Sequence, residues 1–150
     1  MEYLIDLFVS LAVNGFASIV GLDRERAFYP TVLIVAASYY VLFAVMAASR
    51  WTVVTEIAFA SGFLLLAAIG YKRSLWLVAI ALVGHGVFDI VHRLLIENSG
   101  VPHWWPGFCM VIDVIFGGLL AGACGGAGWQ LGDKRNNSFA SLHTGNRPAC

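Results

Sequence analysis

The chain has 150 residues, of which 59% are hydrophobic before glycine is counted. With its 16 glycines the apolar share is about 70%, against about 45–50% in an average soluble domain. Charged residues make up only 12%, and nine Lys or Arg balance nine Asp or Glu. Because a neutral chain this apolar would aggregate in water, the composition excludes a soluble enzyme, a disordered chain and an electrostatic nucleic-acid binder. It predicts an all-α, polytopic membrane protein in one compact domain, with the lipid bilayer as its partner and no nucleic acid.

Five apolar segments are long enough to cross a bilayer as helices, which takes about 20 residues each. In chain order they cover about residues 3–22, 27–49, 52–70, 74–96 and 107–129. No Lys or Arg precedes the first segment, which favours a retained span over a signal peptide. Short connections are expected at residues 23–26, 50–51, 71–73 and 97–106. Residues 1–129 thus form the predicted transmembrane domain, and the polar residues 130–150 a flexible cytoplasmic tail.

Basic residues are distributed unequally between the two sides of these predicted spans. One side holds seven of them, namely Arg24, Arg26, Lys72, Arg73, Lys134, Arg135 and Arg147. The other side holds two, Arg50 and Arg93. Cytoplasmic loops carry an excess of Lys and Arg, so the side with seven is predicted to be cytoplasmic. The N-terminus is then outside and the C-terminus inside, and the connecting loops alone favour this orientation by four to two.

Four acids lie within the predicted spans, namely Asp6, Glu56, Asp89 and Asp113. An ionisable residue in a span is costly, so each is a candidate for function. In the predicted orientation all four lie in the outer half of the membrane. Asp6 has an interfacial position as an alternative, and Glu56 could instead stabilise the N-terminus of its helix. Asp89 and Asp113 lie deepest in the predicted spans, so a purely structural role explains them least well.

The fourth segment carries the densest pattern of polar residues. His85, Asp89 and His92 are spaced i, i+4 and i+7, so they share one helical face. Two imidazoles and a carboxylate on one face can bind a divalent metal such as zinc, or they can relay protons. A His–Asp pair that only locks helix packing is the structural alternative, and His92 could also reach toward the interface.

The connection after this segment adds a third histidine, His103, between two prolines and beside two tryptophans. Because this loop joins the fourth span to the fifth, His103 could fold over the cluster as an extra ligand, or be an ordinary loop residue. The predicted metal ligands are therefore His85, Asp89, His92 and His103. The predicted acid–base or catalytic residues are Asp89, Asp113, His85 and Glu56.

Small and aromatic residues suggest how the helices pack. Gly118, Gly122 and Gly126 recur every four residues, which predicts a close helix contact within the bundle or between protomers of a homo-oligomer. Tyr39 and Tyr40 lie near the middle of the second span. One of them could donate a hydrogen bond to a ligand, although a bond to the backbone is an equal alternative.

Four stretches carry a resemblance to known proteins: ERAFYP at 25–30, ASYYVLF at 37–43, HGVFDIVH at 85–92, and GVPHWWP at 100–106 continuing to Asp113. On these stretches the chain resembles an uncharacterised family of small bacterial multi-pass membrane proteins. The resemblance implies a location in the bacterial inner membrane and implies no reaction. A looser similarity links the His and Asp chemistry to membrane zinc hydrolases and to sterol-isomerase-like bundles, and it assigns no residues.

These observations lead to three functional hypotheses. The first is a membrane enzyme that acts on a lipid or another apolar substrate by metal-assisted or acid–base chemistry. The second is a proton- or cation-coupled carrier that uses the His–Asp line. The third is a non-catalytic subunit of a membrane complex. The first is preferred, because His, Asp and His on one face beneath an aromatic loop are typical of a site.

Overall fold

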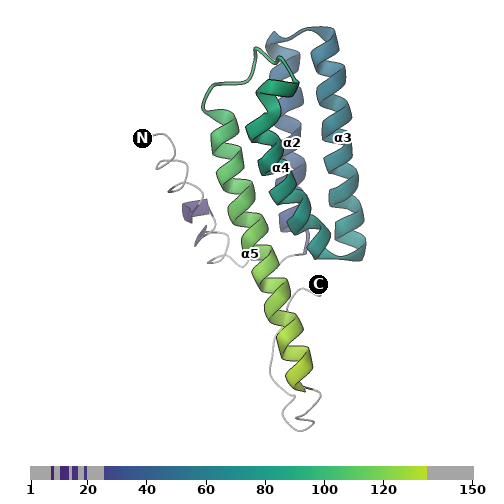
Figure 1. The fold of residues 1–150 in the computed structure, drawn as a ribbon, viewed down its shortest axis with the longest axis vertical. Coiled ribbons are helices and arrows are strands. Elements are labelled where there is room, and N and C mark those ends of the chain that lie inside the picture. Colours follow the sequence, from purple (N-terminus) through teal and green to yellow (C-terminus); the bar gives the residue numbers. More distant parts are fainter. Residues whose placement is uncertain (1–7, 9–10, 14, 17–18, 20–25, 135–150) are drawn as a thin grey trace.

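Four long helices make up most of the computed structural model, which describes residues 8, 11–13, 15–16, 19 and 26–134. They are α2 (Phe28–Ala47), α3 (Arg50–Arg73), α4 (Leu75–Leu95) and α5 (Trp105–Lys134), as Figure 1 shows. Each is long and apolar enough to cross a membrane, α5 over Trp105–Gly125. The described residues contain no strand. The all-α class and four of the five predicted membrane-type helices are therefore confirmed, whereas residues 3–22, with Asp6, lie largely outside the described residues.

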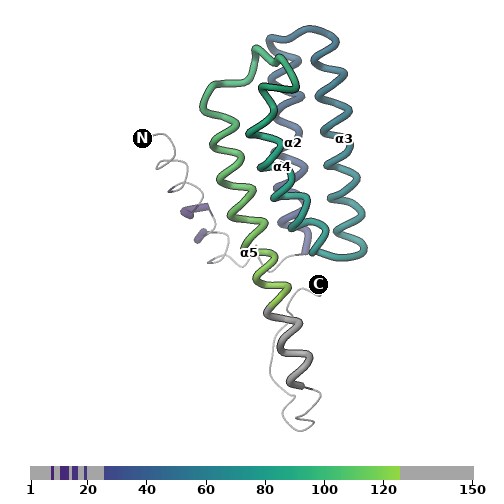
Figure 2. Tube along the Cα trace, viewed as in Figure 1, coloured from purple at the N-terminus to yellow at the C-terminus, as the bar shows by residue number. Residues whose placement is uncertain are grey.

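The four helices alternate in direction along the bundle, as the tube in Figure 2 shows. One end, here called the loop end, contains residues 48–49 and the longer connection 96–104. Two hydrogen bonds join the longer connection to the ends of α2 and α3, from Ser99 Oγ to the Ala47 carbonyl (2.7 Å) and from Thr52 Oγ1 to the Glu97 carbonyl (3.1 Å). The other end, here called the turn end, contains the single residue that joins α3 to α4.

Helix α3 is longer at both ends than the sequence predicted, so the connections expected at residues 50–51 and 71–73 were wrong. Serine caps explain the difference, because hydropathy does not show where a helix is capped. Ser49 caps the N-terminus by accepting from the Thr52 amide at 3.2 Å. Ser74 ends α3 and also caps α4, accepting from the Trp76 amide at 3.3 Å.

Helix α5 begins at Trp105, two residues before the predicted span, with Pro106 in its first turn, where proline is tolerated. It continues to Lys134. Residues 130–134, which we predicted to belong to the polar tail, are therefore helical. The rest of that predicted tail, residues 135–150, lies outside the described residues.

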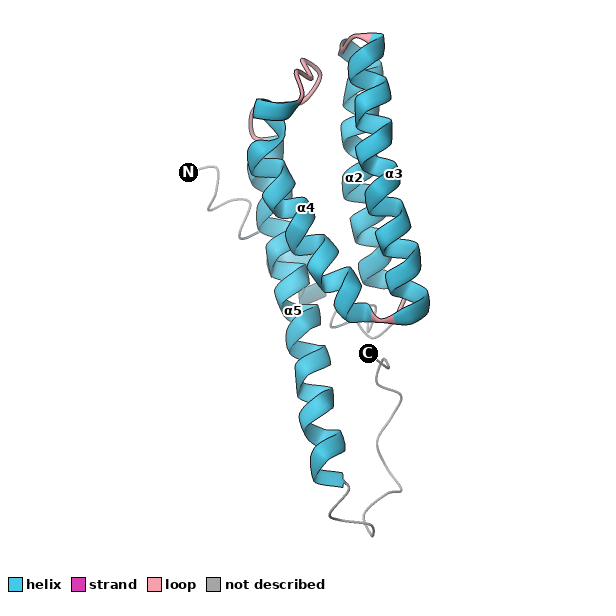
Figure 3. Ribbon diagram, turned by 45° about the vertical axis from the view of Figure 1, so that its right-hand side comes forward, coloured by secondary structure: helices cyan, strands magenta, loops and turns pink. Residues whose placement is uncertain are grey.

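Helix α4 is the most buried of the four, with more than half of its span inside the bundle. Figure 3 shows α4 lying along α5 and α2 lying along α3. The interior has two halves. Toward the turn end it is apolar and includes Leu33, Leu75, Val78, Leu82 and Leu120. Toward the loop end the interior carries buried polar side chains, whereas the outward surface keeps many large apolar side chains exposed, as a lipid-facing surface requires.

Glycines set the close approach of α4 and α5, although not the glycines of the predicted stripe. A Cβ on Gly117 would lie 2.8 Å from Val83 Cγ2, and a Cβ on Gly86 would lie 3.2 Å from Val114 Cγ2. By contrast, a Cβ on Gly118 or Gly122 would meet nothing within 4 Å. Among the described residues, the stripe therefore makes no close helix contact at Gly118 or Gly122.

The surroundings of Gly126, the third member of the stripe, lie outside what the structure describes. A contact between protomers through this face stays a prediction.

Replacing Gly117 with alanine should destabilise the protein, whereas Gly118→Ala should not. The added methyl at Gly117 overpacks the α4–α5 contact and should lower the free energy of unfolding by about 1–3 kcal/mol. At Gly118 the methyl enters open space, and alanine is the better helix former by about 1 kcal/mol. Denaturant unfolding of both variants in detergent measures the difference. Equal stabilities would contradict the assigned contact.

Candidate functional site

Among the described residues, five His, Asp or Glu side chains are buried in the loop-end half of the bundle, and each is at most 1% exposed. They are Glu56 from α3, His85, Asp89 and His92 from α4, and Asp113 from α5. The shared face predicted for His85, Asp89 and His92 points into the bundle. Helix α4 thus supplies three of the five groups, and its neighbours supply their partners.

His85, Asp89 and Asp113 form a compact cluster, here called the inner group. His85 Nδ1 lies 2.6 Å from Asp113 Oδ2 and 3.5 Å from Asp89 Oδ2. One possible ligand atom from each residue lies within 4.8 Å of the other two. The glycine beside His85 favours this proximity, because a Cβ on Gly86 would lie 3.2 Å from Val114 Cγ2 and 3.3 Å from the Met110 carbonyl oxygen of α5.

Each residue of the inner group also has a buried polar atom without a hydrogen-bond partner, namely His85 Nε2, Asp89 Oδ2 and Asp113 Oδ1. An unsatisfied buried polar atom costs about 1–3 kcal/mol. In the described part of the chain, these two carboxylates pair with histidine and tyrosine but with no Lys or Arg. Protons or a cation must supply the missing positive charge. One imidazole and two carboxylates are ligands that a divalent metal such as zinc accepts.

Tyr40 links α2 to the inner group. Its hydroxyl donates to Asp89 Oδ1 at 2.7 Å, and the residue is 2% exposed. We considered a ligand and the backbone as partners for one of the two tyrosines. The Tyr40 hydroxyl instead bonds to a carboxylate of α4. Its neighbour Tyr39 is 39% exposed and packs against Trp105 instead.

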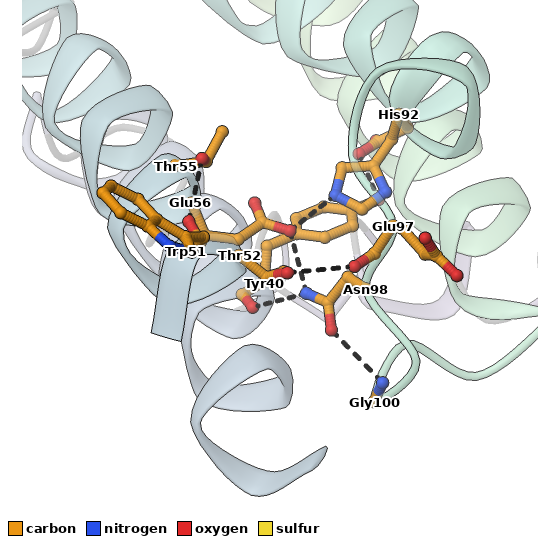
Figure 4. A network of polar contacts seen from close by, with 10 residues as sticks. Tyr40, Trp51, Thr52, Thr55, Glu56, His92, Glu97, Asn98 and Gly100 are labelled. Carbon is orange, nitrogen blue, oxygen red and sulfur yellow. Dashed lines mark hydrogen bonds and ion pairs between the residues drawn. The ribbon is translucent and has the colours of Figure 1, made fainter. Parts of the chain in front are cut away.

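Glu56, His92 and Asn98 form a second cluster nearer the loop, here called the outer group (Figure 4). Glu56 Oε1 accepts from His92 Nε2 at 2.7 Å and from Asn98 Nδ2 at 2.8 Å. The same Asn98 nitrogen donates to the Tyr40 carbonyl at 3.2 Å. The ring of Tyr40 lies against the His92 ring, with centroids 4.2 Å apart. Tyr40 therefore contacts both groups.

The structure separates the predicted metal ligands. It keeps His85 and Asp89 together, adds Asp113 as the third member, and leaves His92 and His103 outside this group. The i+7 spacing places His92 about 10 Å from His85 along the helix axis, level with Glu56. His103 is exposed in the loop, where its Nδ1 lies 2.9 Å from Arg93 Nη1. A common helical face is thus not sufficient for a common ligand site.

The connection 96–104 closes the loop end over the outer group. Asn98 and Ser99 bond it to α2 and α3, and two of its own side chains, Ile96 and Val101, are buried. Gly100 packs directly on the backbone of Phe43, where a Cβ would collide with the carbonyl oxygen. The loop is therefore fitted to the ends of the helices.

Sequence reasoning missed two features of the site. Asn98 lies in an Asn-Ser-Gly stretch that reads as an ordinary turn, and no signal distinguishes it. The Glu56–His92 pair did have a signal. Glu56 lies 18 residues before Ser74 and His92 lies 18 residues after it, so a tight turn at Ser74 brings them level. Phe63 and His85, each 11 residues from Ser74, are likewise in ring contact, with centroids 4.7 Å apart.

Comparisons with protein-family models, with curated proteins and with solved structures found no match to this chain. The resemblance to small bacterial multi-pass membrane proteins therefore stays a prediction.

Asn98→Ala should loosen the connection 96–104, because the buried Glu56 carboxylate and the Tyr40 carbonyl then lose a donor. A loss of about 1–3 kcal/mol corresponds to amide exchange in this loop that is about 5- to 150-fold faster. Hydrogen–deuterium exchange read at Val101, whose amide bonds to the Asn98 carbonyl, reports the change. His103→Ala is the control and should exchange as the wild type does. Unchanged exchange in Asn98→Ala would show that Asn98 does not hold the loop.

Proposed function

We propose that the protein is an integral membrane enzyme that binds a divalent metal at the inner group and acts on a lipid or another apolar substrate. The observation that carries the proposal is the inner group itself. Three ligand atoms from His85, Asp89 and Asp113 lie within 4.8 Å of one another, and each residue keeps a buried atom without a partner. A divalent cation bound between these ligand atoms would offset the charge of the two carboxylates and would give the unpartnered Asp89 Oδ2 a partner.

The chemistry follows from this set of donors. Three protein ligands leave a position open in the usual four-coordinate site, and a bound divalent metal makes a strong nucleophile of water at neutral pH. His85, Asp89 and Asp113 would hold the ion. Glu56 and His92, in the outer group, are the neighbouring acid–base pair. Since the outward surfaces of the helices are apolar, a substrate would reach the site from the lipid.

The distribution of buried polar groups favours an enzyme over a proton- or cation-coupled carrier. Among the described residues, the buried side chains between His85 and the turn end are apolar, including Leu33, Val78, Leu82 and Leu120. A carrier needs polar groups along the route of its ion. The polar groups here reach the loop end and stop at His85. A non-catalytic subunit would need no metal, so metal binding separates it from the enzyme.

We also propose that the loop end faces outward from the inner membrane of a bacterium. Arg26 Nε donates to the Tyr71 carbonyl at 2.8 Å, so Arg26 lies at the turn end with Lys72 and Arg73. Basic residues favour the cytoplasmic side. The inner and outer groups would then lie in the outer half of the membrane.

The metal proposal predicts about one Zn²⁺ per chain in protein purified in detergent without chelators. His85→Ala and Asp113→Asn should each remove most of it, because each removes one of three ligands. His103→Ala removes a histidine outside the inner group and should retain the metal. Elemental mass spectrometry of the four proteins gives the stoichiometry. A wild-type chain that binds no added Zn²⁺, Mn²⁺ or Co²⁺ would rule out the metal-dependent enzyme.

The proposed orientation predicts that a cysteine placed at Glu97 reacts with a membrane-impermeant maleimide on intact cells. A cysteine placed at Lys72 should react only after the membrane is opened. Both side chains are exposed, at the loop end and the turn end respectively. The parent protein gives the background labelling of the native cysteines, and the reverse pattern would invert the topology.

A further inference from the structure

We infer that Tyr40 is a positioning residue for the proposed metal site: it holds Asp89 so that one carboxylate oxygen is kept for the metal, and the outer group holds Tyr40 in place. This inference depends on the metal site proposed above. It gives the outer group a role, since none of its members belongs to the ligand set.

The two oxygens of Asp89 have different surroundings. Oδ1 accepts the Tyr40 hydroxyl at 2.7 Å. Oδ2 is buried without a hydrogen-bond partner and lies 3.5 Å from His85 Nδ1. Without Tyr40, the carboxylate could rotate about its Cβ–Cγ bond and turn both oxygens away from their present directions. The bond from Tyr40 therefore fixes the orientation in which one oxygen faces His85, and partners of this kind orient metal ligands in proteins.

Tyr40 is itself fixed at three points. Its ring lies against His92, its carbonyl accepts from Asn98, and its hydroxyl donates to Asp89. Glu56 holds both His92 and Asn98 through a single oxygen. The outer group thus supports Tyr40 from the side of the loop. A buried tyrosine hydroxyl needs a partner, and Asp89 is the partner that this position provides.

The chain supplies a matched control in the preceding residue. Tyr39 is partly exposed, its ring packs against Trp105 at 4.8 Å, and no bond joins it to either group among the described contacts. Tyr40→Phe and Tyr39→Phe each remove one hydroxyl from adjacent positions of α2. A difference between them isolates the bond to Asp89 from a general effect of losing a tyrosine hydroxyl.

The test uses the full chain in detergent, with Zn²⁺ affinity measured by calorimetry and the site probed with the visible spectrum of Co²⁺. Tyr40→Phe should bind Zn²⁺ about 10–100-fold more weakly, the range found when such partners are removed. Its Co²⁺ spectrum should change, because the Asp89 oxygen is no longer fixed. Tyr39→Phe should match the wild type in both measurements. Asn98→Ala, which loosens Tyr40 from the other side, should show a smaller loss in the same direction.

The outcomes separate the two proposals. Wild-type affinity and an unchanged Co²⁺ spectrum in Tyr40→Phe would overturn the positioning role while leaving the metal site intact. A wild-type chain that binds neither ion would overturn the metal site and the positioning role together. If Tyr40→Phe does not fold, Asn98→Ala decides the question, and unaltered Zn²⁺ binding and Co²⁺ spectrum in that variant would contradict the inference.

Discussion

The fold depends on keeping the polar face of α4 out of lipid and giving each of its groups a partner. A carboxylate or an imidazolium in an apolar interior is unfavourable unless it is paired. Each of the three groups on this face finds its partner on a different helix. Asp89 accepts from Tyr40 of α2, His92 bonds to Glu56 of α3, and His85 bonds to Asp113 of α5. Helix α4 is thus the axis around which the other three are placed.

Packing and polar pairing act in different halves of the same bundle. Toward the turn end, α4 contributes Leu75, Val78 and Leu82 to an apolar core. Toward the loop end, its small Gly86 lets α5 approach, which brings Asp113 against His85. Apolar packing alone allows helices to slide or rotate at modest cost, whereas a directed hydrogen bond does not. The polar half therefore fixes the register of a bundle that the apolar half only holds together.

Only the local part of this arrangement, within single helices, could be predicted from the sequence. Hydropathy gave the helices, and the i, i+4, i+7 spacing gave the buried face of α4, because both depend on neighbours along one helix. The third member of the inner group comes from α5, and no periodicity encodes how α5 is rotated against α4. The spacing also grouped His92 with His85, but the structure places His92 beside Glu56. Residues on one face of a helix can lie far apart along its axis. The ends of α3 were misplaced because Ser49 and Ser74 act as caps, which hydropathy does not register.

The single residue between α3 and α4 has a consequence for how the chain enters the membrane. Since Glu56 and His92 are equidistant from Ser74, a hairpin of these two helices already places acid against base. Such a hairpin can enter lipid with these two side chains already bonded to each other, before the rest of the protein is in place. Asp89 requires α2 as well, and His85 requires α5, which is made last of the four. The order of synthesis thus leaves the inner group as the final part of the interior to be completed.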